Sequence, residues 1–350
     1  MICIDGSQKS GSGTIVRYAT SLAVLVQKPL HLVNIRAKRE NPGLRPQHLK
    51  AVEALRELSG GKLEGAEVGS SEIFFRPGRG IRGGRFSWDI GTAGSTTMLA
   101  LTLLPVALFA SEPSTFRISG GLFQDFAPSA FHMKYALFPL LRKMGCRLEL
   151  RIVRPGYVPK GGGIIELEVK PVEGALRPIR LEDQGEVRRI WGIALSSHLK
   201  HRKVSDRMAE ACSEILRRKG FNPEIEVRYD TSALQSGAAL AVFAHTSTGC
   251  IIGADRAGEL RRSSEEIGRF VAKALLEDLS TGATVDRFLA DQLILFAALA
   301  EGESVYRFPY FTDHMESNIW LVREILGAEV ELKEEKRIIE IRGVGYRWRR

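Results

Sequence analysis

The feature that most constrains the fold of this 350-residue chain is an internal repeat with a period of about 83 residues. Three segments each have the pattern of an apolar helix, a short polar turn and a strand: residues 20–35, 102–118 and 292–308. A second helix is expected after each of them because apolar residues recur at i, i+3, i+4 and i+7, at residues 48–58, 131–141 and 318–326. A nearly constant period of this length indicates tandem α/β modules rather than a solenoid.

The spacing of the repeats also locates an insertion. Thr20 and Thr102 are 82 residues apart, whereas Thr102 and Gln292 are 190 apart, so about 107 residues are additional between the second and third units. The additional part has its own predicted strands, at 190–196, 224–229 and 238–245, and helices, at 205–219 and 264–279. We therefore predict an α/β (α+β) protein in which three repeated βαβαββ-like modules form a core domain. That core comprises residues 1–180 and 281–350, and a smaller α/β domain is inserted at residues 181–280.

Charge and composition limit the classes of partner. The net charge is +9 with a pI of about 9.5, and the many arginines suit recognition of phosphate groups. Nucleic acid or a polyphosphate is therefore the expected partner, the alternative being a basic surface that is merely solvated. No apolar run is long enough for a membrane span, and the first residues lack the pattern of a signal peptide. The four cysteines are scattered without zinc spacing, so a cytoplasmic location is expected.

Three glycine-rich turns are candidates for binding an anion. They lie at residues 5–13, 89–95 and 156–163, and the last contains Lys160. Glycine allows backbone amides to approach a phosphate closely, although none of the three has the spacing of a P-loop. Basic residues also crowd the start of the predicted insert, at 198–203 and 217–219. These indicate either an RNA-binding face or a solvated helix surface.

A group of cations follows the first repeat. Arg36, Lys38, Arg39 and Arg45 lie between a predicted strand and a predicted helix, without acidic residues clustered beside them. Alternation along a strand would place Arg36 and Lys38 on one face. This pattern favours a polyanion subsite, and ion pairing to distant acidic residues is the alternative.

His314 is the strongest candidate for chemistry. It lies where a helix is expected to begin, and we predict that Asp313 is the N-cap and Glu316 its capping-box partner. A helix N-terminus disfavours a charged imidazole and attracts anions. Such a histidine could stay neutral and accept a nucleotidyl group; the alternative is that it only decorates the helix start.

Taken together, these motifs resemble those of the RNA 3′-terminal phosphate cyclase family. The matching stretches follow one another in order along nearly the whole chain: residues 4–7, 36–48, 89–95, 119–121, 127–128, 156–163, 289–292 and 314–318. The resemblance implies the repeated core and inserted domain described above. The architecture also resembles that of the carboxyvinyl transferases of aromatic biosynthesis, but their substrate motifs are missing.

The resemblance implies an ATP-dependent reaction. A histidine attacks the α-phosphorus and forms histidine–AMP, AMP passes to an RNA 3′-phosphate, and the 2′-hydroxyl displaces AMP to leave a 2′,3′-cyclic phosphate. By this resemblance His314 is the nucleophile, and Arg36, Arg39, Arg45 and Lys160 bind phosphates of ATP or RNA. The nucleotide-contacting residues would be Phe288, Leu289, Ala290, Asp291, Gln292 and Pro128. A divalent metal, Mg or Mn, is expected with ligands unknown, and the family is often dimeric, so a homodimer is possible.

The chain departs from the family pattern at three places. Ser10 stands where an acidic residue that would bind a metal is usual, and Thr14 replaces a glutamine in the same loop. Leu101 replaces another glutamine, and Leu122 and Phe123 replace a Thr-Asp pair. These departures keep a second interpretation open, namely a non-catalytic RNA-binding factor in ribosome biogenesis. That branch of the family typically lacks the histidine, which this chain retains.

Overall fold

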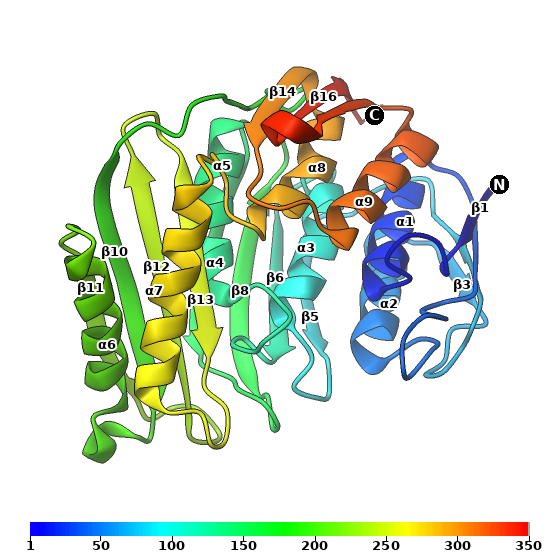
Figure 1. Ribbon diagram of the computed structural model, residues 1–350. Helices are drawn as coiled ribbons and strands as arrows, with labels where there is room; N and C mark the ends of the chain where they lie inside the picture. Colours follow the sequence, from blue (N-terminus) through cyan, green and yellow to red (C-terminus); the bar gives the residue numbers. More distant parts are fainter. Residues whose placement is uncertain (349–350) are drawn as a thin grey trace.

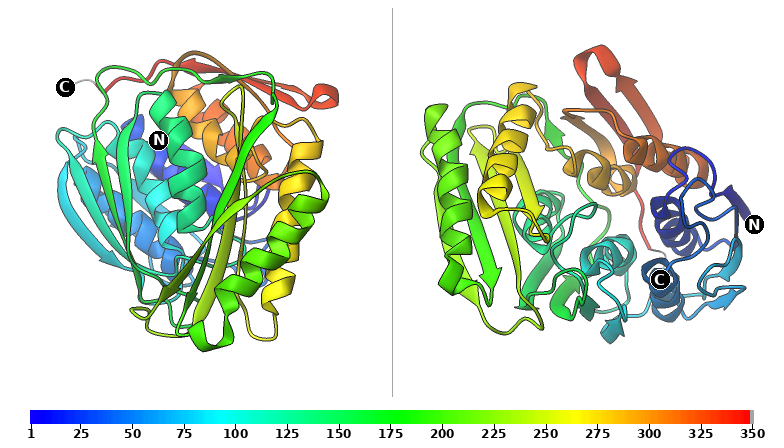
Figure 2. Two further views of the ribbon diagram at one scale, coloured as in Figure 1. Left: turned by 90° about the vertical axis from the view of Figure 1, so that its left-hand side faces the viewer. Right: turned by 60° about the horizontal axis from the view of Figure 1, so that its bottom comes forward.

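The computed structural model describes residues 1–348, which form a mixed α/β protein with four four-stranded sheets in this range. Figure 1 shows the sheets and their helices in sequence colours, and Figure 2 gives two further views. The predicted α/β fold class is confirmed.

Three of the sheets share one order of strands. The first contains β1 (Ile2–Asp5), β2 (Leu30–Val33), β4 (Ile73–Arg76) and β3 (Lys62–Glu64). The second contains β5 (Gly84–Asp89), β6 (Ser114–Gly120), β8 (Gly163–Lys170) and β7 (Arg147–Arg154). The third contains β9 (Arg180–Leu181), β14 (Glu301–Arg307), β16 (Ile338–Val344) and β15 (Glu329–Lys333). In each sheet, the first two strands in this order are parallel and the other two neighbouring pairs are antiparallel. This agreement is what a repeat requires, although the number of modules stays a prediction.

The helices of these three sheets pack against one another in the interior. They are α1 (Gly13–Leu25), α2 (Pro46–Ser59), α3 (Thr96–Ala107), α4 (Ala130–His132), α5 (Phe138–Lys143), α8 (Leu289–Leu299) and α9 (Asp313–Leu321). A π-helical turn, η1 (Met133–Leu137), joins α4 to α5, and another, η3 (Val322–Leu326), extends α9. Helix α1 contacts α2, α3 and α9, and α8 contacts α9. The right-hand view of Figure 2 shows these helices inside and the sheets outside, which explains why nearly all residues of α1 and α3 are buried.

Short polar signals set where these helices begin and end. The hydroxyls of Ser12, Ser95 and Thr312 accept backbone N–H groups at the starts of α1, α3 and α9. Helix α2 begins with Pro46 and ends at Gly60, whose φ of 64° suits a residue without a side chain. These caps place the N-termini of α1 and α9 beside each other, since the two helices are in contact.

The fourth sheet lies in the predicted insert and has its own apolar core. Its strands are β11 (Glu224–Asp230), β10 (Val187–Ser197), β12 (Gly237–Thr246) and β13 (Ile251–Ala257). Helices α6 (Val204–Arg218) and α7 (Ser264–Ser280) pack on this sheet and enclose a separate group of buried side chains. Sequence analysis predicted all of these elements except β13. The division into a core and an inserted domain stays a prediction, and this separate core is consistent with it.

Two short 3₁₀ turns, η2 (Lys200–Arg202) and η4 (Glu334–Lys336), complete the elements of residues 1–348. In the same part of the chain, none of the helices has both the length and the apolar character needed to cross a membrane.

Candidate functional site

The predicted nucleophile His314 faces a cavity of about 240 Å³ between helices α1, α3, α8 and α9. The cavity is also lined by Phe288, Asp291, Gln292 and Pro128, four residues predicted to contact a nucleotide. The structure thus brings together side chains that are up to 186 positions apart in the sequence, from 128 to 314. Leu289 and Ala290, predicted with them, are fully buried and do not line the cavity.

His314 lies in the first turn of α9, but the cap differs from the prediction. Thr312 is the N-cap, with extended backbone angles and a hydroxyl that accepts the N–H of Met315 at 3.2 Å. The prediction that Asp313 caps the helix and Glu316 completes a capping box is therefore wrong. Glu316 lies one position too far along for that role and instead forms an ion pair with Lys9 at 3.0 Å.

The surroundings of His314 favour its neutral form. Burial lowers the pKa of His314 below its ordinary value of 6.5, and the charges of Arg17 and Arg39 lower it further. Asp313 acts in the opposite direction but does not reverse the shift. The imidazole therefore carries a free lone pair at neutral pH, which a nucleophile needs.

A threonine fixes the ring of His314. The Oγ1 atom of Thr14 lies 3.2 Å from Nδ1 of His314 and accepts a hydrogen bond from Nη2 of Arg17 at 3.1 Å. Arg17 is 5% exposed, and its Nε atom has no partner among residues 1–348. Sequence analysis missed Arg17, although a single cation within the apolar run of the first helix is a signal that could have identified it.

The loop before α1 is joined to α9 by further polar contacts. The N–H of Ser10 donates to the hydroxyl of Ser317 at 3.2 Å, and that hydroxyl donates to Oγ of Ser10 at 2.8 Å. Oγ of Ser10 also lies 2.8 Å from Oγ of Ser12. Ser10 and Thr14, two of the departures from the family pattern, therefore both belong to the contact that holds the histidine-bearing helix.

The inner end of the cavity has unsatisfied amide groups that fit a nucleobase. Both polar atoms of the Gln292 side chain and Oδ1 of Asn318 are buried without a partner within the described chain. Nδ2 of Asn318 donates to the carbonyl oxygen of Asp291 at 2.9 Å, which fixes that amide. Phe288 offers an aromatic face nearby, and Leu101 makes part of the wall apolar. Buried amides rarely lack partners, so a bound base that supplies them fits this site.

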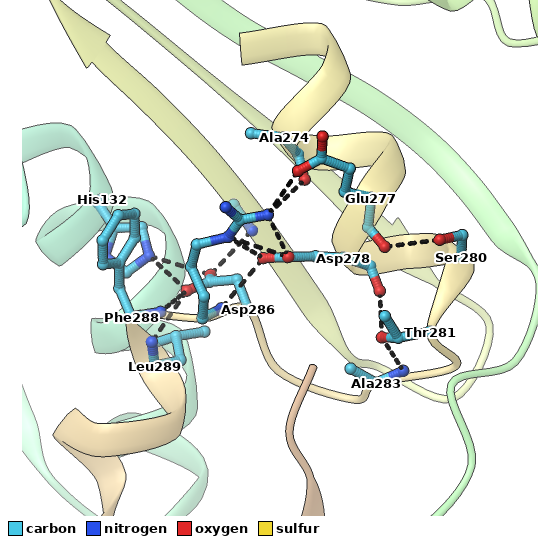
Figure 3. Close-up of polar contacts among 12 residues, drawn as sticks. His132, Ala274, Glu277, Asp278, Ser280, Thr281, Ala283, Asp286, Phe288 and Leu289 are labelled. Carbon is cyan, nitrogen blue, oxygen red and sulfur yellow. Dashed lines mark hydrogen bonds and ion pairs between the residues drawn. The ribbon is translucent and has the colours of Figure 1, made fainter. Parts of the chain in front are cut away.

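A buried ion pair positions Phe288. Asp286 accepts the backbone N–H groups of Phe288 and Leu289, both at 2.9 Å, and contacts Nε2 of His132 at 3.0 Å (Figure 3). The rings of His132 and Phe288 meet edge to face at 5.6 Å between centroids. Burial opposes the charge of His132, but Asp286 outweighs it and raises the pKa of His132. The N–H of Gly253 also donates to Asp286, so β13 is tied to the same point.

Asp291 differs from its neighbour Asp286 in charge. Burial raises the pKa of Asp291 to about 7, although Arg17 acts to lower it. Burial also lowers the pKa of Arg17 to about 10, which leaves it charged at neutral pH. The cavity therefore holds one fixed cation beside His314 and one carboxyl group that titrates near neutrality.

The other predicted phosphate-binding residues lie outside this cavity. Arg36 and Lys38 are in a turn after β2, and Arg36 has a φ of 53°, so the prediction that they share a strand face is wrong. The turn forms because Arg36 donates to the carbonyl oxygens of Asn41 and Gly43, at 2.6 and 2.9 Å. Arg39, on the same turn, is exposed and close enough to His314 to lower its pKa.

Arg45 and Lys160 border other parts of the site region. Arg45 is the exposed residue before α2. Burial of His48 is the main reason that its pKa is lowered to about 2, and the charge of Arg45 lowers it further. The backbone N–H of Lys160 donates to Gln235, and its loop packs against the turn at 92–93. That loop borders a groove of about 620 Å³ that shares Phe126 with the His314 cavity.

Residues 1–348 contain no group of three or more His, Cys, Asp or Glu side chains arranged to hold a metal ion. Ser10, which occupies the position of the usual acid, is bonded to other hydroxyls instead. The side chains present therefore do not form a metal site by themselves.

A neutral histidine, one fixed cation and unpartnered amides thus line a single cavity on a fold of three similar sheets. The family whose model matches residues 8–332 is described as RNA 3′-terminal phosphate cyclase. Proteins named RNA 3′-terminal phosphate cyclase are 39% identical to the chain in Hyperthermus butylicus and 36% in Pyrobaculum neutrophilum, with 98–99% of each chain covered. One from Pyrococcus furiosus is 38% identical, with 95% of both chains covered. The protein belongs to the RNA 3′-terminal phosphate cyclase family.

Proposed function

We propose that the protein converts an RNA 3′-terminal phosphate to a 2′,3′-cyclic phosphate at the expense of ATP, with His314 as nucleophile. The observation that carries this proposal is the neutral imidazole of His314 in one cavity with Arg17 and the unpartnered amide of Gln292. A pure RNA-binding scaffold would have no use for this combination. Membership of the family agrees with it.

The cavity would hold ATP by its base and its phosphates. Phe288 and Pro128 would flank adenine, and the free amide atoms of Gln292 and Asn318 would bond to its edge. Arg17 would lie beside the phosphate next to His314. When bound, ATP supplies an electrophilic phosphorus and a pyrophosphate leaving group.

The chain's residues would then serve two displacements at the same phosphorus. In the first, Nε2 of His314 forms a bond to the α-phosphorus while the bond to pyrophosphate breaks. In the second, an oxygen of the RNA 3′-phosphate takes the place of His314. The 2′-oxygen of the RNA finally loses its proton and displaces AMP, which closes the cyclic phosphate. Arg17 and Arg39 reduce the repulsion between the anionic groups, which is much of what phosphoryl transfer requires.

Thr14 would select the reactive tautomer of His314. Its Oγ1 can accept a hydrogen bond from Nδ1–H as well as the one from Arg17, because a hydroxyl oxygen has two lone pairs. With the proton held on Nδ1, the lone pair of Nε2 is free to attack. The same bond would stabilise the positive charge that develops on the ring as the N–P bond forms.

We expect a divalent metal, Mg or Mn, to accompany the triphosphate, although the side chains of residues 1–348 do not form a site for it by themselves. A homodimer and a cytoplasmic location also stay predictions.

The test uses ATP labelled at the α-phosphate, incubated with the whole protein and Mg or Mn. We expect a labelled, acid-labile phosphoramidate on the wild type and none on His314→Ala. His201→Ala is the matched control, because His201 is exposed on the predicted insert and should leave labelling unchanged. RNA binding without any adduct on the wild type would refute the catalytic proposal and support the RNA-binding factor instead. An adduct that persists in His314→Asn would place the nucleophile elsewhere.

A further inference from the structure

Six cations come from the last turn of α2, from β3 and from the 76–85 segment, which crosses the end of α2 remote from His314. We refer to them as the arginine cluster: Arg56, Lys62, Arg76, Arg79, Arg82 and Arg85. All six side chains are exposed. Within residues 1–348 none of them forms an ion pair or a side-chain hydrogen bond.

The fold brings the cluster together by turning the 76–85 segment over the C-terminal end of α2. The N–H of Arg82 donates to the carbonyl oxygen of Leu58 at 2.8 Å, and a side chain at Gly78 would overlap the carbonyl oxygen of Ser59. The guanidinium of Arg82 lies beside Gly60, the C-cap of α2. Strand pairing of β3 with β4 sets Lys62 directly opposite Arg76.

This arrangement is electrostatically unfavourable for the protein alone. Like charges directly opposite each other in an antiparallel pair destabilise it, and Lys62 and Arg76 have no acid between them. Glu57, adjacent to Arg56, accepts a hydrogen bond from Nε1 of Trp88 at 2.8 Å and is engaged there. The C-terminal carbonyl groups of α2 compensate only the charges closest to the helix end.

Several other basic residues on the surface are neutralised by ion pairs, unlike the six cations of the cluster. Arg217 and Arg218 of α6, which sequence analysis singled out, form ion pairs with Glu210 and Glu214. Arg207 pairs with Glu265 at 2.7 Å. The solvated interpretation therefore applies to Arg217 and Arg218, whereas the arginine cluster has its donors free for an external polyanion.

We propose that the arginine cluster binds the phosphate backbone of the RNA substrate upstream of its 3′ end. The inference rests on the proposed function for the identity of the polyanion. Arginine donates two parallel hydrogen bonds to a phosphate, so five arginines and a lysine form a surface suited to successive phosphates.

The length of α2 sets where along the RNA this contact falls. At its N-terminal end Gln47 borders the groove that adjoins the His314 cavity, and the cluster surrounds its other end. The helix has 14 residues and is thus about 21 Å long. Phosphates follow one another about every 3.4 Å in a stacked strand, so the cluster would contact the RNA roughly six nucleotides from the 3′ end.

The test compares two fourfold variants that remove the same charge. In one, Arg76, Arg79, Arg82 and Arg85 are replaced by Gln; in the matched control, Arg147, Arg180, Arg207 and Arg218 are replaced, all exposed and ion-paired. Affinity is measured by fluorescence anisotropy for 3′-phosphorylated RNAs of about 15 and about 3 nucleotides. We expect the cluster variant to bind the long RNA at least about 10-fold more weakly, with a salt slope reduced by about 3. The control variant, and the short RNA with both variants, should change by less than about twofold.

An equal loss with the control variant or with the short RNA would overturn the proposal, since it would reflect net charge alone. Unchanged RNA binding with lost binding to phosphatidylserine vesicles would also overturn it and indicate a lipid surface. Labelling of His314 with ATP alone needs no RNA, so it is measured on every variant. If the wild type is not labelled by ATP but the cluster variant still binds the long RNA more weakly, the proposed reaction is refuted. The proposal that the arginine cluster binds RNA is then still supported.

Discussion

At the scale of single residues, Thr14 contacts the ring of the proposed nucleophile. The resemblance implies a glutamine at this position, and here a shorter hydroxyl reaches Nδ1 of His314 at 3.2 Å. Arg17, one helical turn further on, bonds to the same hydroxyl from the other side. The polar departures in the first loop therefore do not by themselves imply loss of activity.

We predict that Thr14→Val, which keeps the shape and removes the hydroxyl, slows labelling of His314 by roughly 10- to 100-fold, the value of a hydrogen bond to a charged group. Thr14→Ser should restore most of the rate. ¹⁵N NMR of the His314 ring provides a readout that needs no turnover: the wild type should carry its proton on Nδ1, and the Val variant should show a mixture of tautomers. A wild-type ring protonated on Nε2 would contradict the role assigned to Thr14.

At the scale of helices and strands, the buried pair of His132 and Asp286 joins three elements. It connects α4, the start of α8 and β13. Its pH dependence follows from the two pKa shifts. The raised pKa of His132 gives stability that is complete below 6.5 and lost as pH rises through the raised value. The lowered pKa of Asp286, where His132 outweighs burial, gives stability that is complete above 3.8 and lost as pH falls through the lowered value.

We therefore predict that Asp286→Asn lowers the free energy of unfolding by about 3 kcal/mol, since it leaves His132 without its counter-charge. The difference from the wild type should be largest between pH 3.8 and 6.5. The affinity for ATP should fall too, because Phe288 loses the acceptor that fixes its backbone. Urea unfolding across this pH range is the measurement. Glu173→Gln, which breaks an exposed pair with Arg147, should change stability by less than about 1 kcal/mol.

Sequence periodicity was sufficient for most elements. The helices of the repeat and the predicted elements of residues 181–280 depend on local patterns of apolar residues. Such patterns can be read from the sequence without knowledge of the tertiary contacts. Strand β13 was missed because its sequence, Ile251–Ala257, contains glycine and two charged residues and alternates poorly. The turn at Arg36 was misread as a strand because what bends it is a contact between the Arg36 side chain and later carbonyl groups.

Within the site, motifs identified several residues that line the cavity but missed Arg17, which also lines it, and the buried pair behind Phe288. His314, Phe288 and Gln292 came from recognisable segments, and the structure places all three together. Arg17 and the pair of His132 with Asp286 were not found, because their importance arises from burial and from partners up to 154 positions away. A sequence without an alignment contains no sign of such contacts.

At the scale of the whole molecule, Tyr346 joins the segment after β16 to the C-terminal end of α1. The hydroxyl of Tyr346 donates to the carbonyl oxygen of Leu25 at 2.6 Å, and its ring meets Phe109 edge to face. The N–H of Tyr346 also donates to Leu299, so one residue connects the ends of α1 and α8.

We predict that Tyr346→Phe, which removes only this hydroxyl, lowers the free energy of unfolding by about 1 kcal/mol. The dependence on denaturant concentration should not change, because the surface exposed on unfolding stays the same. Tyr310→Phe is the control, since its hydroxyl bonds to no residue within 1–348 and its loss should have no measurable effect. Equal stabilities of all three proteins would show that the terminal contact contributes nothing.

Strand β9 at Arg180–Leu181 finds its neighbour β14 only at residues 305 and 306. During translation, β9 therefore stays without its β14 partner until more than a hundred further residues have been made. Helices α8 and α9, which carry Gln292 and His314, emerge in the same late portion. Chains that stop before α9 consequently lack the cavity in which Gln292 and His314 meet, so the reaction proposed for them could begin only after both helices have been made.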